Sequence, residues 1–227
     1  MSSVLRAAWL IMLKDLRVEA RSRELAYTTL FFAIATVLVF AFAFVRDGRP
    51  LEGSAGGILW VAIIFSGTLA LGRAFERERQ AETLRALLLA PVERAAVYLG
   101  KLFALLILMA LVQVVLVPVV ALLFGAPLGR APLLLVLLLA TGTIGFGAVG
   151  TFFAAMLVRA QSRDVLLPVL LYPFAVPVVI GGVFGTGAIF AAEPNYELAR
   201  MMLAMLVFFD AVFVTLALWT FAPVMKE

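Results

Sequence analysis

The 227-residue sequence contains no cysteine and no histidine. Without cysteine the chain cannot form a disulfide framework, and neither residue is available as a metal ligand. Histidine is also the usual general base and the usual axial ligand of haem iron. We therefore expect no catalytic residue and no metal site, because serine, zinc and aspartyl enzyme chemistries all lack parts here.

Charged residues are also scarce, at 14%, whereas 65% of residues are hydrophobic and the mean hydropathy is +1.13. Soluble domains are nearer half apolar and a quarter charged. The surplus apolar surface predicts an all-α polytopic membrane protein, because a backbone in lipid must satisfy its own hydrogen bonds. One transmembrane domain over 1–227 is expected, with six spans long enough to cross the bilayer, at 25–45, 54–71, 102–124, 132–157, 165–184 and 198–222.

Lysine and arginine gather in alternate connections between these spans. They lie mainly in residues 1–24, in the loop 73–101, at Arg159 and Arg163, and at Lys226. Such residues are enriched on the cytoplasmic side, so both termini and the second and fourth loops are predicted to be cytoplasmic. Because the basic residues are interleaved with acidic ones and split among loops, nucleic acid is not an expected partner.

Residues 1–24 predict an interfacial helix. Leu5, Trp9, Met12 and Leu16 recur at intervals of three to four residues, with basic residues among the polar positions. Such a helix would lie flat on the cytoplasmic leaflet of the lipid bilayer, and a solvated charged tail is the alternative. No convincing cleavage site follows the first apolar run, so we expect the segment to be retained.

The loop 73–101 is long compared with the other connections, and its pattern is helical. Leu84, Leu87 and Leu88 form an apolar stripe in a densely charged segment, and Pro91 is placed to end one helix and start another. We expect a cytoplasmic helical hairpin. Its apolar stripe predicts docking on a partner, with packing on the membrane interface as the alternative.

This loop resembles the coupling region of bacterial ABC export permeases with six spans. The matching residues are Phe75-Glu76-Arg77-Glu78-Arg79, the segment 84–91 and Gly100-Lys101. Further matching residues are Lys14-Asp15-Leu16, Glu19, the cluster 21–24, Leu166-Leu167-Pro168, Tyr172-Pro173 and Val176-Pro177. With these residues included, the chain is similar over nearly its full length to CcmB, the permease subunit of the cytochrome c maturation haem exporter. The resemblance implies that the residues coupled to the ATPase are Arg73, Glu76, Arg77, Glu78, Glu82, Arg85, Leu87, Leu88 and Pro91.

The resemblance also implies a bacterial inner-membrane complex with haem as its cargo. A second permease copy, a cytoplasmic CcmA-like ATPase, CcmC-like and CcmD-like haem-handling subunits and a periplasmic CcmE-like haem chaperone would be the partners. The chain has no phosphate-binding loop of its own, because Ala95 stands where Gly100-Lys101 would need an upstream glycine. We expect it to bind no cofactor itself and to use ATP through the partner subunit.

Polar and small residues inside the spans are further candidates. Asp210 is the only ionisable residue deep in a span, and Gln113 is the only intramembrane amide. A carboxyl group in lipid is costly, which predicts a site that changes during transport, a dimer contact, or a hydrogen bond between these two residues. Span four carries a small-residue packing strip, and three prolines predict that span five is kinked or broken near a gate; these are Thr143, Gly147, Thr151 and Ala155, and Pro168, Pro173 and Pro177. Residues 185–195 are expected to form a re-entrant or surface segment.

Three other functions stay open at this stage. The same type of machine could export a drug, a lipid or a polysaccharide. A secondary transporter without a motor would be expected to show internal repeats or several intramembrane charges, which are not found. A membrane enzyme is the third alternative, and it lacks the catalytic groups described above.

Overall fold

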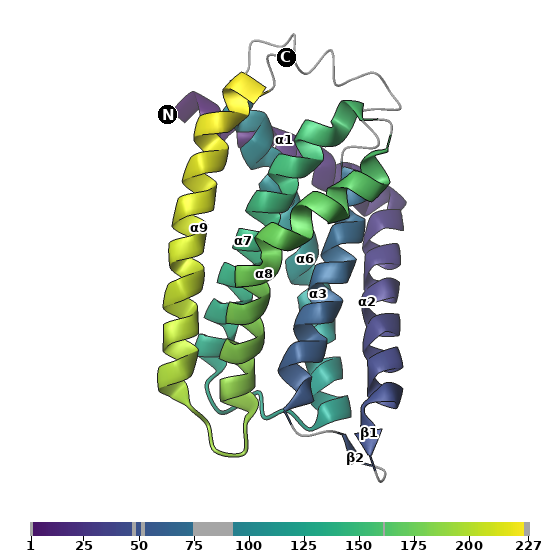
Figure 1. Cartoon of the computed structure of the whole chain (residues 1–227). Helices are drawn as coiled ribbons and strands as arrows, with labels where there is room; N and C mark the ends of the chain where they lie inside the picture. The colour runs from purple at the N-terminus through teal and green to yellow at the C-terminus, as the bar shows by residue number, and fades with distance from the viewer. Residues whose placement is uncertain (1, 47–48, 51–52, 75–92, 161, 225–227) are drawn as a thin grey trace.

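The computed structural model describes residues 2–46, 49–50, 53–74, 93–160 and 162–224. This part of the chain is almost wholly helical (Figure 1). A short 3-10 helix, η1 (Leu157–Arg159), follows the fourth span, and strand β1 (Val45–Arg46) pairs antiparallel with β2 (Arg49–Pro50). The α-helices are α1 (Ser2–Ser22), α2 (Glu24–Ala43), α3 (Ser54–Ala74), α6 (Arg94–Phe124), α7 (Pro132–Met156), α8 (Arg163–Phe190) and α9 (Tyr196–Val224).

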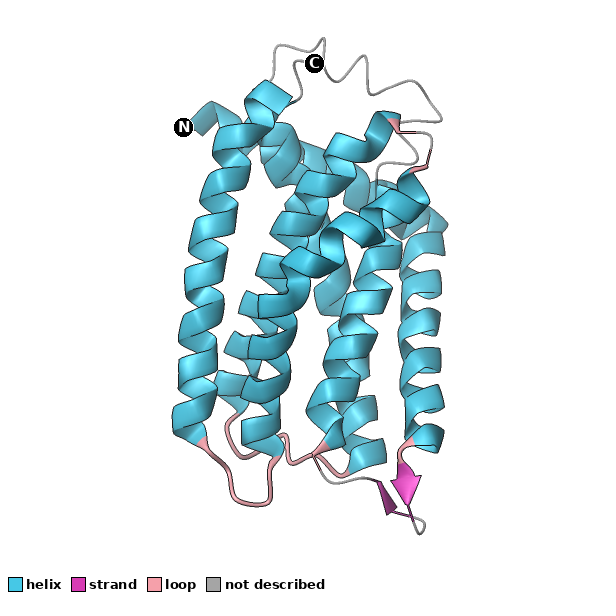
Figure 2. Ribbon diagram, in the orientation of Figure 1, coloured by secondary structure: helices cyan, strands magenta, loops and turns pink. Residues whose placement is uncertain are grey.

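Six of these helices, all except α1, are long and apolar enough to cross a membrane. This confirms the all-α fold and the six predicted spans, with changes at their ends. Helix α6 begins at Arg94 rather than at residue 102, and α8 extends to Phe190 rather than to residue 184. The six helices run side by side, and α1 crosses the end of the bundle opposite the β1–β2 hairpin (Figures 1 and 2).

Helix α3 lies at the centre of the bundle. In its most apolar stretch 72% of the residues are buried, against 17% in α2 and 17% in α9. Mean hydropathy does not separate central from peripheral helices, because side chains that face lipid are as apolar as those that face the core. The outer faces of α2 and α9 therefore carry large exposed apolar side chains, among them Phe31, Phe42, Phe208 and Trp219.

Helix α8 is continuous through Pro168, Pro173 and Pro177. A proline removes one backbone hydrogen bond and bends a helix, and Figure 2 shows the first part of α8 slanting before the helix turns to run beside α9. The expectation that residues 185–195 leave the helix is wrong for 185–190. Gly185 lets α8 pack closely on α7, since a Cβ there would lie 2.7 Å from Leu138 Cδ2, so this glycine serves packing instead of breaking the helix.

The connection between α1 and α2 is a single sharp turn at Arg23, whose φ of 54° is in the left-handed region. The side chain of Glu19 stabilises the turn, because its Oε1 accepts a hydrogen bond of 2.8 Å from the backbone N–H of Ala26. That N–H lies in the first turn of α2, where the helix offers no acceptor. Glu19 thus fixes the angle between the two helices.

Helix α1 packs on α6, so it is not a solvated tail, and its position at the membrane interface stays a prediction. Ala8, Ile11 and Met12 are buried in this contact. Two residues of the predicted stripe, Leu5 and Trp9, point outward and are exposed, whereas Met12 is buried. The helix therefore has two apolar faces, one that packs on α6 and one that is open.

Candidate coupling and intramembrane sites

Most of the predicted coupling residues lie outside the described residues: Glu76, Arg77, Glu78, Glu82, Arg85, Leu87, Leu88 and Pro91. Arg73 is described, at the end of α3, where its Nη1 lies 3.3 Å from Oε1 of Glu24 at the start of α2. Both side chains are exposed, so this ion pair contributes little to stability. It does show that the end of α3 lies beside the start of α2.

A buried arginine also holds the end of α3. Arg163, the first residue of α8, is only 3% exposed, and its Nη2 donates a hydrogen bond of 3.0 Å to the carbonyl oxygen of Leu71. That carbonyl is in the last turn of α3, where helix carbonyls lack partners and a positive charge is favourable. Arg163 therefore ties the start of α8 to the point where the chain leaves α3.

The start of α6 is held in a similar way. Lys101 is 4% exposed, and its Nζ lies 2.9 Å from Oδ2 of Asp15 on α1, while Oδ1 of Asp15 lies 3.0 Å from Nζ of Lys14. Next to this pair the backbones come close, because a Cβ on Gly100 would lie 2.8 Å from the carbonyl oxygen of Ala8. The sequence motifs Lys14-Asp15 and Gly100-Lys101 are thus two halves of one contact.

A third contact joins α6 to α7 near the same end. The hydroxyl of Tyr98 is fully buried and donates a hydrogen bond of 3.0 Å to the carbonyl oxygen of Ala148. The residues that bound the segment 75–92 are therefore connected to α1, α2, α7 and α8 by polar contacts. Sequence reasoning missed Arg163, Tyr98 and the partner of Lys101, because the residues in each contact are far apart along the chain.

The centre of the bundle is built around Trp60 of α3, which is fully buried. Its ring lies against two glycines: a Cβ on Gly142 of α7 would lie 2.8 Å from Cζ3, and a Cβ on Gly182 of α8 would lie 2.7 Å from Cζ2. Small residues let helices approach closely in membranes. Here they make a socket in which one large side chain of α3 contacts both α7 and α8.

The small-residue strip Thr143, Gly147, Thr151 and Ala155 is buried in α7. Thr143 Oγ1 accepts a hydrogen bond of 2.6 Å from Nε2 of Gln113 on α6, and a Cβ on Gly147 would lie 3.1 Å from Leu102 Cδ1. This half of the strip faces α6. Thr151 Oγ1 is buried and has no hydrogen bond within the described part of the chain.

Asp210 lies on α9 against α7. Its Oδ1 is buried beside Gly145, where a Cβ would come within 2.5 Å, and this oxygen accepts no hydrogen bond from any described residue. Of the three alternatives for Asp210, the hydrogen bond with Gln113 is not formed: Nε2 of Gln113 donates to Thr143, and Oδ1 of Asp210 has no hydrogen-bond partner among the described residues. The described residues contain no group of three or more acidic, cysteine or histidine side chains that could hold a metal ion.

Six apolar helices that form one bundle, each long enough to cross a bilayer, indicate a polytopic membrane protein. The CcmB protein family matches residues 6–226, and the chain belongs to this family. It is therefore a membrane permease component of cytochrome c maturation haem export and not its ATPase, as expected from the sequence.

Curated relatives agree with this placement. Heme exporter protein B of Pseudomonas aeruginosa is 31% identical over 172 residues, which is 76% of this chain and 75% of that protein. The protein of the same name from Paracoccus denitrificans is 32% identical over 173 residues, 76% of this chain and 78% of that protein. The one from Haemophilus influenzae is 28% identical over 185 residues, or 82% of each chain.

Proposed function

We propose that this chain is the permease of an ABC exporter complex in which a CcmA-like ATPase drives the membrane helices through the segment 73–101. Both termini and this segment would face the cytoplasm of a bacterial inner membrane, an orientation that the distribution of lysine and arginine supports. One structural observation carries the coupling proposal. The two ends of the segment are held by buried cations, Arg163 at the end of α3 and Lys101 near the start of α6.

A displacement of the segment would reach α8 through Arg163. The hydrogen bond from Arg163 to Leu71 fixes the first residue of α8 to the end of α3, and Pro168, Pro173 and Pro177 follow within the same helix. Each proline weakens the backbone hydrogen bonding at its position, so α8 bends more easily there than an uninterrupted helix. We place the moving gate at these prolines.

A displacement of the segment would reach α1 through Lys101. The Lys101–Asp15 pair and the close packing of Gly100 on Ala8 fix α1 to the start of α6. Because both charges are largely removed from solvent, separating them would leave an uncompensated charge in an apolar site. We therefore expect α1 and α6 to move as one body.

Haem is the proposed cargo, and histidines that ligate its iron would come from other subunits, because this chain has none. A second permease copy, CcmC-like and CcmD-like membrane subunits and a CcmE-like chaperone would complete the complex. The exposed apolar faces of α2 and α9 offer enough uncovered surface for membrane subunits as well as for lipid.

The test is deletion of the gene, followed by measurement of covalently bound c-type haem with b-type haem as internal control. We expect c-type haem alone to be lost and to be restored by the wild-type gene. The double variant Glu76→Lys/Glu78→Lys and the variant Arg163→Gln should not restore it, whereas Arg200→Gln, which changes an exposed arginine of α9, should. Unchanged c-type haem in the deletion strain would refute the haem assignment and leave an exporter of another substrate.

A further inference from the structure

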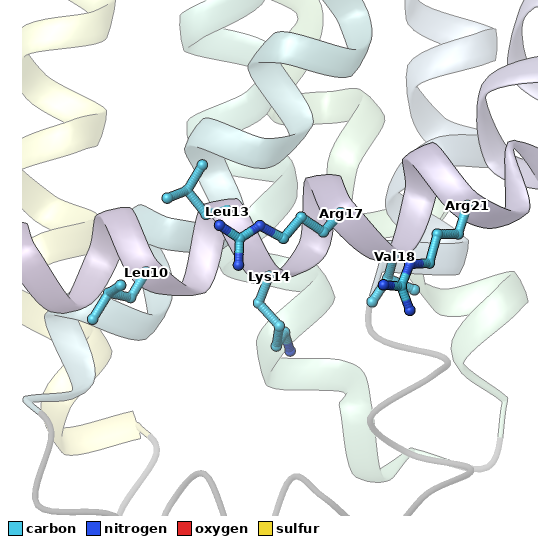
Figure 3. Close-up of a pocket in the computed structure, with 6 residues that line it drawn as sticks. All are labelled: Leu10, Leu13, Lys14, Arg17, Val18 and Arg21. Carbon is cyan, nitrogen blue, oxygen red and sulfur yellow. The ribbon is translucent and has the colours of Figure 1, made fainter.

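A shallow groove with a volume of about 280 Å³ runs along the open face of α1. Figure 3 shows six side chains that line it, and within the described part of the chain all of them belong to α1: Leu10, Leu13, Lys14, Arg17, Val18 and Arg21. Apolar and basic residues recur at intervals of three to four along the helix, so they share one side of it. The groove is therefore both apolar and positively charged.

The acidic residues near this groove are engaged elsewhere. Asp15 accepts its two contacts from Lys101 and Lys14, and Glu19 accepts the backbone N–H of Ala26. Within the described ranges no acidic side chain pairs with Arg17 or Arg21, and both are exposed. Two guanidinium groups on successive turns are thus available to an anion.

The apolar side chains of the groove are exposed as well. Leu10 is 58% exposed and Val18 is 42% exposed. A ligand that covers both kinds of side chain must carry a negative charge next to a hydrocarbon chain. Inorganic phosphate or a nucleotide would satisfy the arginines but leave Leu10 and Val18 uncovered.

We propose that this groove binds an anionic phospholipid of the leaflet on which α1 lies. Its phosphate would lie between Arg17 and Arg21, because guanidinium groups bind phosphate oxygens in a bidentate manner. Its acyl chain would cover Leu10 and Val18. The proposal rests on the cytoplasmic placement of the N-terminus in the proposed function and on the predicted interfacial position of α1. It makes α1, which is fixed to the start of α6, an anchor against the membrane.

The experiment uses the absence of cysteine in the wild-type chain, which allows a single label at a chosen position. The full-length variant Val18→Cys carries a fluorophore in phosphatidylcholine nanodiscs that contain doxyl-labelled phosphatidylglycerol or, in parallel, doxyl-labelled phosphatidylcholine at the same mole fraction. We expect the labelled phosphatidylglycerol to quench the fluorophore more strongly than the labelled phosphatidylcholine. Each arginine should raise the preference for phosphatidylglycerol roughly fivefold. A label at Val165, which is exposed on α8, should be quenched equally by the two lipids.

Three variants of the labelled chain define the site. The preference should disappear in Arg17→Gln/Arg21→Gln, persist in Arg17→Lys/Arg21→Lys, and persist in Arg6→Gln, an exposed arginine of α1 outside the groove. Equal quenching by both lipids in the wild-type background, or an unchanged preference in the double glutamine variant, would overturn the proposal. So would loss of the preference on adding inorganic phosphate, which would indicate a site for free anions.

The quenching measurement does not depend on haem, so it separates this proposal from the proposed function. A lipid preference in a chain that fails to restore c-type haem would leave the groove in place and refute only the function. A chain that restores c-type haem but shows no lipid preference would refute only the lipid site in the groove. Absence of quenching by either lipid at Val18 would contradict the placement of α1 on the bilayer and would overturn the lipid site with it.

Discussion

The socket around Trp60 gives the sharpest test of the packing. We predict that Gly182→Ala destabilises the chain, because the new Cβ would lie 2.7 Å from Cζ2 of Trp60, whereas non-bonded carbon atoms are ordinarily about 3.5–4.0 Å apart. The ring has little room to move away, since it is fully buried and also lies against Gly142. Overpacking of this kind costs about 1–3 kcal/mol.

Replacement of any helical glycine by alanine also brings a favourable change in helix propensity, roughly 1 kcal/mol in soluble helices. The matched control is Gly187→Ala in the same helix, where an added Cβ meets nothing within 4 Å. The difference between the two variants therefore isolates the steric term. We expect Gly182→Ala to be less stable than Gly187→Ala by about 1–3 kcal/mol.

The free energy of unfolding is measured on the full-length chain in mixed micelles, by titration with sodium dodecyl sulfate and circular dichroism. The double variant Trp60→Phe/Gly182→Ala should lose less free energy of unfolding than the two single variants lose in sum, because the smaller ring makes room for the Cβ. Equal stability of Gly182→Ala and Gly187→Ala, or strict additivity in the double variant, would refute the socket.

Two further predictions concern buried polar groups and use the same unfolding assay. Lys101→Met should destabilise the chain by roughly 2–3 kcal/mol, which is somewhat below the value for a fully buried pair because Asp15 is 18% exposed. The double variant Lys101→Met/Asp15→Asn should recover part of this loss of stability. Equal stability of the wild type and Lys101→Met would contradict the contact. Asp210→Asn should be at least as stable as the wild type, because burying a neutral amide costs less than burying a carboxylate whose Oδ1 accepts no hydrogen bond. A marked loss of stability in this variant would mean that Asp210 has a partner.

The six spans could be predicted from the sequence because the length of an apolar run is a local property. The order of burial could not be predicted, since both α3 and α9 are apolar enough to cross a membrane, yet 72% of one stretch and 17% of the other are buried. The helical nature of residues 185–190 was also hidden, because glycine is read as a helix breaker in water while in a membrane bundle it allows close packing.

The site contacts show the same limit. The spacing of small residues in α7 identifies a packing strip at Thr143 and Gly147, but α7 also carries Gly142 and Gly145 on other sides. Only the three-dimensional arrangement assigns Gly142 to Trp60 and Gly145 to Asp210. Residues that attract attention by their type, such as Asp210, were found from sequence, whereas their partners were not, because each partner belongs to a different helix.

The distribution of buried polar contacts indicates where the bundle is stiff. Arg163, Lys101 and Tyr98 each bind an oxygen on another helix close to the residues that bound the segment 75–92. Separating any of these helices would leave a buried donor without an acceptor, which is costly in an apolar medium. In the proposed function, motion that enters through the segment 73–101 would therefore be taken up more easily within a helix than between these helix ends. In α8 the three prolines lower the cost of such a change, so a changed bend in α8 follows from the same contacts that hold its first residue in place.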